Sequence, residues 1–145
     1  MRSIPESTSL LFDIWTLSNV THAVLDEALR ASGLSANEFA IYSVLQAPDG
    51  RSPGELAYAM QLPPTTVSSV VRRLERRGHV LRKDDPADGR SYRLHLSAAG
   101  KAVLAKAKPA FTRVVARVEG ELELPVAQAR AVLDQIDHAV RAAGS

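Results

Sequence analysis

The chain has 145 residues, of which 46% are hydrophobic and 23% are charged, a balance typical of one compact globular domain and not of a disordered segment. It contains no cysteine, which excludes a disulfide framework, a thiolate metal site and a cysteine redox switch. Residues 1–15 are interrupted by Pro5, Glu6 and Asp13, so we expect no signal peptide, and no stretch approaches the ~18 apolar residues of a membrane span. These features favour a soluble, cytoplasmic protein.

The positive charge is concentrated in one block of the sequence. The net charge is only +2, but residues 72–101 hold nine Lys or Arg against four acidic residues, whereas residues 1–50 hold two against six. A concentrated basic excess is the electrostatic footprint of a nucleic-acid-binding face. From charge alone, a solvated charged surface is an equally good interpretation.

The first predicted element is a long helix over residues 8–32, where apolar side chains recur at three- and four-residue steps. Gly33 fits its left-handed C-cap. Ser35 and Glu38 then form a capping-box pattern, which predicts the start of a second helix that stops at residues 48–50.

A third helix is predicted from Ser52, Pro53 and Glu55, which suit the N-cap, first and third helical positions. The prolines at 63 and 64 force a turn, and a fourth helix follows over residues 65–77, ending at Gly78. Its core side is expected to consist of Val67, Val70, Val71 and Leu74.

After Gly78 the apolar period changes from 3.6 to 2, which predicts a strand at 80–83 and a second at 92–96. The intervening loop, residues 84–91, is interpreted as too long for a two-residue hairpin turn. Ser97 suits the cap of a fifth helix, which Pro109 should bend or interrupt. Pro125 fits the first position of a sixth helix.

Two short helices joined by a tight turn and followed by a β-hairpin make a winged helix-turn-helix. The second helix of such a pair enters the DNA major groove, and the hairpin loop reaches the neighbouring minor groove. The basic block covers the end of the fourth helix and the whole hairpin. Charge and topology therefore predict the same surface.

The wing carries a family resemblance. Residues 85–91 (DPADGRS) and 94–100 (LHLSAAG) resemble the D-x-R wing motif and the following helix start of the MarR (multiple-antibiotic-resistance regulator) family. Residues 55–57 and 71–78 also fit the family pattern, so the resemblance covers essentially the whole chain. Four residues depart from that pattern: Pro63, Ser68, Ser69 and His79. These departures bear on the preferred DNA sequence and not on the fold.

The resemblance implies a mainly α fold with a small β-hairpin wing, in a single MarR-like domain over residues 1–145. The DNA-binding lobe would span about 35–97. The N- and C-terminal helices, at about 8–32 and 98–143, would form the stem of a homodimer.

The candidate DNA contacts lie on the fourth helix and the wing. Short hydroxyl side chains let a helix approach the groove closely, and Arg90 can extend into a narrow minor groove from a turn stiffened by pairing with Asp88. The alternative is that Thr65 and Thr66 only cap the helix and Arg90 forms only a surface ion pair. The expected DNA-binding residues are Thr65, Thr66, Ser68, Ser69, Arg72, Arg73, Arg76, Arg82, Lys83, Asp88, Arg90 and Arg93, with Arg77 as a further phosphate candidate.

No metal, cofactor or catalytic site is expected. The four histidines, 22, 79, 95 and 138, lack metal-ligand spacing, and no nucleophile elbow or phosphate loop is present in the sequence. In the MarR family an organic ligand often binds where the first two helices meet the fifth. Trp15, His22 and Tyr42 are the candidate ligand-binding residues, with plain core and dimer packing as the alternative.

The sequence thus predicts a dimeric repressor of a palindromic operator in double-stranded DNA, released by a small organic ligand. A transcriptional activator, a ligand-independent regulator and a winged helix used for protein–protein contact remain as alternatives.

Overall fold

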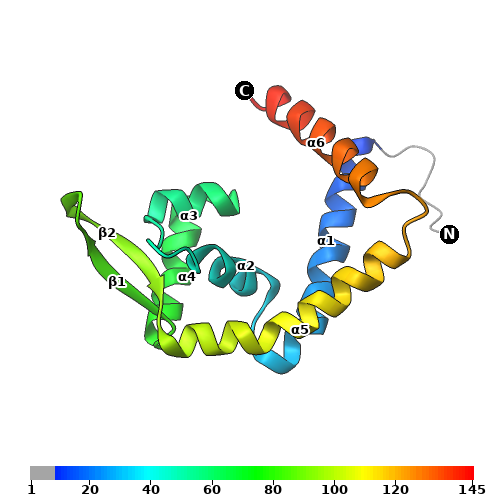
Figure 1. The fold of residues 1–145 in the computed structure, drawn as a ribbon. Helices are drawn as coiled ribbons and strands as arrows, with labels where there is room; N and C mark the ends of the chain where they lie inside the picture. Colours follow the sequence, from blue (N-terminus) through cyan, green and yellow to red (C-terminus); the bar gives the residue numbers. More distant parts are fainter. Residues whose placement is uncertain (1–8) are drawn as a thin grey trace. The chain divides into compact units, whose positions relative to one another are not determined.

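The computed structural model describes residues 9–145 (Figure 1). By compactness the chain divides into a first unit that ends at Phe111 and a second unit, Thr112–Ser145. The order of elements is α1 (Leu10–Leu29), a 3-10 turn η1 (Arg30–Ser32), α2 (Ala36–Leu45), α3 (Pro53–Met60), α4 (Pro64–Arg76), β1 (Val80–Asp85), β2 (Asp88–Leu96), α5 (Ala98–Gly120) and α6 (Val126–Ala143). The winged-helix fold expected from the sequence is confirmed.

Local capping chemistry sets the beginnings of the early helices. Ser9 caps α1 by accepting a hydrogen bond from the Phe12 N–H; residue 8, where this helix was expected to begin, lies outside the described residues. Gly33 ends the following turn with φ of 78°. Both predicted capping boxes are present, at the starts of α2 and α3.

Two prolines sit differently from the sequence-based expectation, and a third, expected to bend or interrupt its helix, does not interrupt it. Pro64 is the first residue of α4 rather than part of the turn before it, because a first-turn proline lacks only an N–H that would have no helical partner. Helix α5 continues through Pro109. Pro125 is the N-cap of α6 and not its first helical residue.

The hairpin is longer than predicted, and the expectation of a long loop was wrong. The turn consists of Pro86 and Ala87 alone, and a register shift follows the Asp84–Tyr92 pair. The carboxylate of Asp85 accepts a hydrogen bond from the Ala87 N–H at 2.9 Å, which closes the tight turn. Both strands are solvent-exposed near the tip, so they pair there without the apolar alternation on which the sequence prediction depended.

The core of the first unit joins the end of α1, helices α2–α4, the base of the wing and the start of α5. Val67, Val71 and Leu74 of α4 are buried in it, and Val70 packs against it. The rings of Phe39 and Phe111 lie 4.7 Å apart and join α2 to α5. This packing fixes which side of α4 faces outward.

In the second unit, α6 has no buried residue among the eighteen that form it. Val132, Leu133 and Val140 are large exposed apolar side chains on this helix. Within residues 9–145, no helix combines the length and the apolar character that crossing a membrane requires.

Candidate nucleic-acid interface

The outward side of α4 carries short hydroxyl side chains at its N-terminal end. Thr65, Thr66, Ser68 and Ser69 are all exposed. The N-cap is Pro63, and no side chain caps this helix, so the threonines are not used as caps. These hydroxyls are available to hydrogen-bond base edges or phosphates.

The arginines at the end of α4 fall into two groups. Arg72 and Arg76 are exposed, and no carboxylate of the described residues forms an ion pair with either. Arg73 and Arg77 both contact the carboxylate of Glu38 at 3.1 Å. Arg72 and Arg76 are therefore available to phosphates, whereas Arg73 and Arg77, although also exposed, are engaged with Glu38.

Glu38 is a buried carboxylate on α2, only 4% exposed. Burial would raise its pKa, but a hydrogen bond from the Ser35 N–H and the guanidinium groups of Arg77 and Arg73 outweigh that effect and lower the pKa. Glu38 therefore stays charged and ties α2 to the end of α4. The sequence identified Glu38 only as a capping residue; its ion pairs were not predicted.

A second polar link lies beside this cluster. The Tyr42 hydroxyl and Nδ1 of His79 share a hydrogen bond of 2.6 Å, and burial raises the pKa of Tyr42. His79 follows Gly78 directly, where α4 passes into β1. Tyr42 of α2 thus contacts the segment that joins the predicted recognition helix to the wing.

On the wing, Arg82 pairs with Glu75 of α4 and its guanidinium lies 4.5 Å from the centre of the Tyr92 ring. The hydrogen bond to Glu75 raises the pKa of Arg82. Lys83 is exposed and forms no ion pair within the part of the chain that the structure describes. Arg82 therefore braces the hairpin against α4, and Lys83 projects into solvent.

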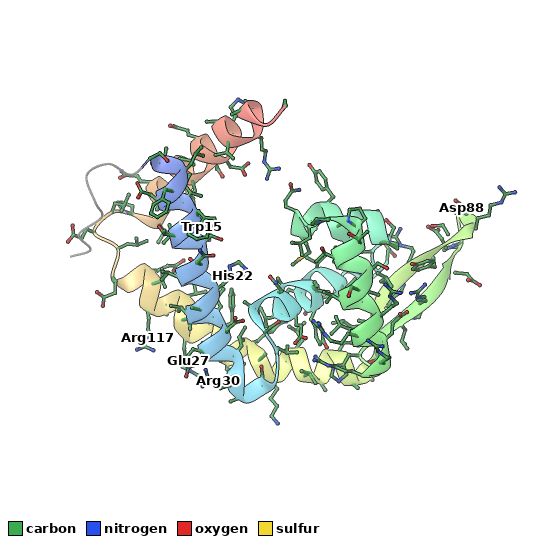
Figure 2. All side chains as sticks on the ribbon, turned by 180° about the vertical axis from the view of Figure 1, so that it is seen from behind. Trp15, His22, Glu27, Arg30, Asp88 and Arg117 are labelled. Carbon is green, nitrogen blue, oxygen red and sulfur yellow. The ribbon has the colours of Figure 1, made fainter. Side chains whose placement is uncertain are left out.

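Arg90 and Asp88 lie near the wing tip, where Figure 2 shows Asp88 at the end of the hairpin. Their side chains do not form the expected pair: the Asp88 carboxylate accepts a hydrogen bond from the backbone N–H of Arg90, at 3.0 Å. The Arg90 side chain is exposed and contacts no carboxylate among residues 9–145. Asp88 thus shapes the tip, and the guanidinium of Arg90 remains available.

Arg93 is largely enclosed, with a side chain 20% exposed. It donates hydrogen bonds to the Asp49 carbonyl at 2.7 Å and to the carboxylate of Glu55 at 3.0 Å. The Ser52 N–H, with nearby Arg93, lowers the pKa of Glu55. Burial, together with Lys83 and Arg93, lowers the pKa of His95, which favours a neutral imidazole.

The three candidate ligand-binding residues have different environments. On α1, Trp15 is 62% exposed, and His22 is exposed with Nδ1 2.9 Å from the Ser18 carbonyl (Figure 2). Tyr42 is fully buried and its hydroxyl bonds to His79. The hydroxyl of Tyr42 is therefore used inside the lobe, whereas Trp15 and His22 are on the surface of this single chain.

Known proteins resemble this chain in both sequence and fold. Residues 32–91 match the model of the MarR family. An HTH-type transcriptional repressor of Mycobacterium tuberculosis is 29% identical over 122 residues, covering 84% of this chain and 88% of that protein. The crystal structure of the M. tuberculosis transcriptional regulator MosR in complex with DNA superimposes with a TM-score of 0.82 at 26% identity, covering 94% of this chain and 98% of the other.

The segment that holds the winged helix, residues 32–91, matches the MarR family. The proteins similar to this chain include an activator as well as repressors: the transcriptional activatory protein BadR of Rhodopseudomonas palustris is 29% identical over 97 residues, 65% of this chain and 55% of that protein. These relatives are transcriptional regulators and not enzymes. The protein is a transcriptional regulator with the DNA-binding MarR fold.

Proposed function

We propose that this protein is a homodimeric repressor that binds a palindromic operator, with α4 in the major groove and the wing in the adjacent minor groove. The observation that carries the proposal is the composition of the exposed side chains on α4 and on the wing. It combines the hydroxyls of α4 with basic side chains that have no ion pair within residues 9–145: Arg72, Arg76, Lys83 and Arg90.

The roles of these side chains follow from their chemistry. Ser68 and Ser69 would read base edges, since they are short and exposed near the start of α4. Arg72, Arg76 and Lys83 would bind phosphates, and Arg90 would enter the minor groove, where the negative potential is concentrated. Asp88 would keep the wing tip in shape.

Exposed apolar side chains on the terminal helices support the homodimer. In the first unit, Leu10, Leu11, Trp15 and Leu17 of α1 are each more than half exposed. In the second unit, α6 buries no residue. Helices with this much uncovered apolar surface need a packing partner, and a second copy of the chain would supply one in the stem expected for the family.

The test of DNA recognition is selection of bound sequences from a random DNA pool, followed by footprinting. The proposal predicts an inverted repeat with half-sites about one helical turn apart, roughly 10 bp centre to centre. Enrichment of a single isolated half-site would contradict it. A winged helix used only for protein–protein contact would enrich no sequence.

Activation is the second candidate function, because the relative BadR is named as an activator. The two functions share the DNA-binding surface and differ in where the operator lies relative to the promoter. A promoter fusion in a deletion strain separates them: loss of a repressor raises expression, and loss of an activator lowers it.

We further propose that a small organic molecule releases the DNA, binding near Trp15, His22 and Tyr42. An aromatic acid would suit these side chains, with its ring on Trp15 and its polar end at His22. To release DNA, the ligand must bind the DNA-incompetent state more tightly than the competent one.

Trp15 is the only tryptophan, so its fluorescence reports on ligand binding directly. In a screen of aromatic acids, we expect one compound to quench Trp15 and weaken operator binding over the same concentration range. A compound that quenches Trp15 and leaves the affinity for DNA unchanged would show binding without coupling and contradict release.

A further inference from the structure

Arg93 lies opposite another basic residue in the hairpin. Lys83 and Arg93 are direct partners in the β1–β2 register, and like charges opposite each other destabilise a strand pair. Lys83 is exposed, but Arg93 is not directed into solvent to relieve the repulsion. It turns toward the loop that precedes α3.

All of the polar contacts of Arg93 are to acceptors of the protein. Nε donates to the Asp49 carbonyl at 2.7 Å, and one terminal nitrogen donates to the Gly50 carbonyl at 3.2 Å and to the Glu55 carboxylate at 3.0 Å. The other terminal nitrogen lies 3.8 Å from the Asp85 carboxylate. One guanidinium therefore joins the loop, the first turn of α3 and the outer end of β1.

The neighbouring backbone makes the same junction. Arg51 and Leu94 exchange two hydrogen bonds, of 3.0 and 2.7 Å. A side chain at Gly50 would overlap the Leu94 carbonyl and the His95 ring. Beyond this contact, a groove of about 510 Å³ lies between the loop and the hairpin, lined by Asp49, Lys83, Asp85 and Arg93 among others. The Arg93 guanidinium thus lies at this groove and connects the loop before α3 with the outer part of the wing.

We propose that Arg93 is a positioning residue, which holds the wing in the orientation that Arg90 needs to reach DNA and does not itself bind phosphate. This inference rests on the wing contact of the proposed function. Three of the five N–H donors of Arg93 are hydrogen-bonded to the protein, so turning the guanidinium toward a phosphate would break these hydrogen bonds. A wing ordered in advance spares the complex the entropic cost of ordering it on binding.

A positioning role and a phosphate-binding role of Arg93 predict different effects on the affinity for operator DNA. A residue that acts only through Arg90 cannot cost more than Arg90 itself, and its effect disappears once Arg90 is removed. A residue that binds phosphate acts independently of Arg90, and its loss also lowers the salt dependence by about one phosphate contact.

The first experiment is a double-mutant cycle on operator affinity over a salt series. We expect Arg93→Met to weaken binding about 3- to 10-fold in the wild-type background and less than about 2-fold in Arg90→Ala. In the Arg90→Ala background, Arg93→Met should also leave the salt slope unchanged. Arg30→Met is the control for lost charge, because Arg30 pairs with Glu27 at the end of α1, far from the wing tip within the first unit (Figure 2). It should bind as the wild type does.

The second experiment measures the wing without DNA. The chain has no cysteine, so Ala87→Cys in the hairpin turn gives a single site per chain for a fluorescent label. We expect Arg93→Met to lower the anisotropy of the label. Glu55→Gln should lower it as well, since glutamine keeps the hydrogen bond from the Ser52 N–H and loses the charge that holds Arg93.

The outcomes separate this inference from the function on which it rests. Three outcomes would overturn the positioning role: additive effects of Arg93→Met and Arg90→Ala, a salt slope that Arg93→Met reduces by about one contact in the Arg90→Ala background, or a label of unchanged mobility in both variants. If Arg90→Ala binds like the wild type, the proposed wing contact is wrong, and the role of Arg93 in fixing the wing is then decided by the anisotropy alone.

Discussion

Among single residues, the buried carboxylate of Glu38 does most to hold α4 in its orientation. Glu38 accepts hydrogen bonds from the Ser35 N–H and contacts Arg73 and Arg77. A buried carboxylate is costly unless such partners surround it. Because Arg73 and Arg77 lie on the same helix as the exposed Arg72 and Arg76, Glu38 also sets which arginines remain available to DNA.

Replacing Glu38 by alanine should destabilise the protein by about 1–3 kcal/mol, since it removes the hydrogen bond of the capping box and two charge-assisted contacts to a buried carboxylate. Glu38→Gln, which keeps the capping hydrogen bond, should cost less. Urea unfolding at neutral pH measures both, with Glu27→Gln as the control for loss of an exposed acidic side chain. Equal stability of the wild type and Glu38→Ala would contradict the role given to Glu38.

The pH dependence of this effect has a definite sign. The pKa of Glu38 is lowered in the folded state, so the ion pairs stabilise the protein above the unfolded pKa of about 4.3 and lose that contribution as the pH falls below it. The stability gap between the wild type and Glu38→Gln should therefore be full at pH 7 and shrink on acidification through this range. A gap that widens on acidification would contradict the lowered pKa.

Arg90→Ala should weaken operator binding by about 1–3 kcal/mol and leave the fold intact, because Arg90 is exposed at the wing. Changes at Ser68 or Ser69 should instead shift the preferred DNA sequence. Isotherms on the selected operator and on single-base variants distinguish the two effects. Equal affinity of the wild type and Arg90→Ala would remove the wing from the mechanism.

The capping residues were readable from the sequence, but the ion pairs were not. Ser35 and Glu38 are three residues apart, and the capping box is a local pattern. Arg73 is 35 residues from Glu38, and nothing in the arginine run of α4 distinguishes the arginines that pair with Glu38 from those that do not. That distinction arises from how α2 packs across α4, which requires the three-dimensional structure.

Among the elements, the sequence predicted the position of the wing hairpin correctly, but it predicted strands that are too short. Periodicity located the apolar halves of both strands, near Val80 and Leu94, because these residues face the core. Toward the tip the strands are polar and exposed, so backbone pairing and an Asp85 turn, rather than burial, determine their extent. The strand residues near the tip therefore show no alternation of apolar and polar side chains from which a strand could be predicted.

The base of the wing offers a test of this element. Gly50 has φ of 65°, and a Cβ there would overlap β2, so Gly50→Ala should destabilise the lobe by about 1–3 kcal/mol and weaken DNA binding. Gly54 in α3 has open space around the added Cβ and no positive φ, so Gly54→Ala should be neutral or slightly stabilising. Thermal unfolding of both variants measures the contrast, and equal effects would contradict the junction described here.

For the whole molecule, the exposed apolar side chains of α1 and α6 predict that the chain forms a dimer and not a stable monomer. Light scattering should show a dimer at micromolar concentration. Leu133→Glu on α6 should weaken the dimer about tenfold or more, since burying a leucine contributes about 1.5–3 kcal/mol and a charge cannot replace it. Gln135→Glu adds a charge to the same helix and should leave the mass unchanged. A stable, folded wild-type monomer would contradict the dimer.

In the proposed complex, two copies of α4 and the wing bind one inverted repeat through phosphate and groove contacts together. The affinity of the wild type for the selected operator and for a single half-site, measured from about 50 to 200 mM salt, tests this arrangement. We expect operator affinity to fall about 10³-fold or more over this range and the half-site to bind far more weakly at every salt concentration. Affinity that is indifferent to salt, or equal affinity for the half-site and the full repeat, would contradict it.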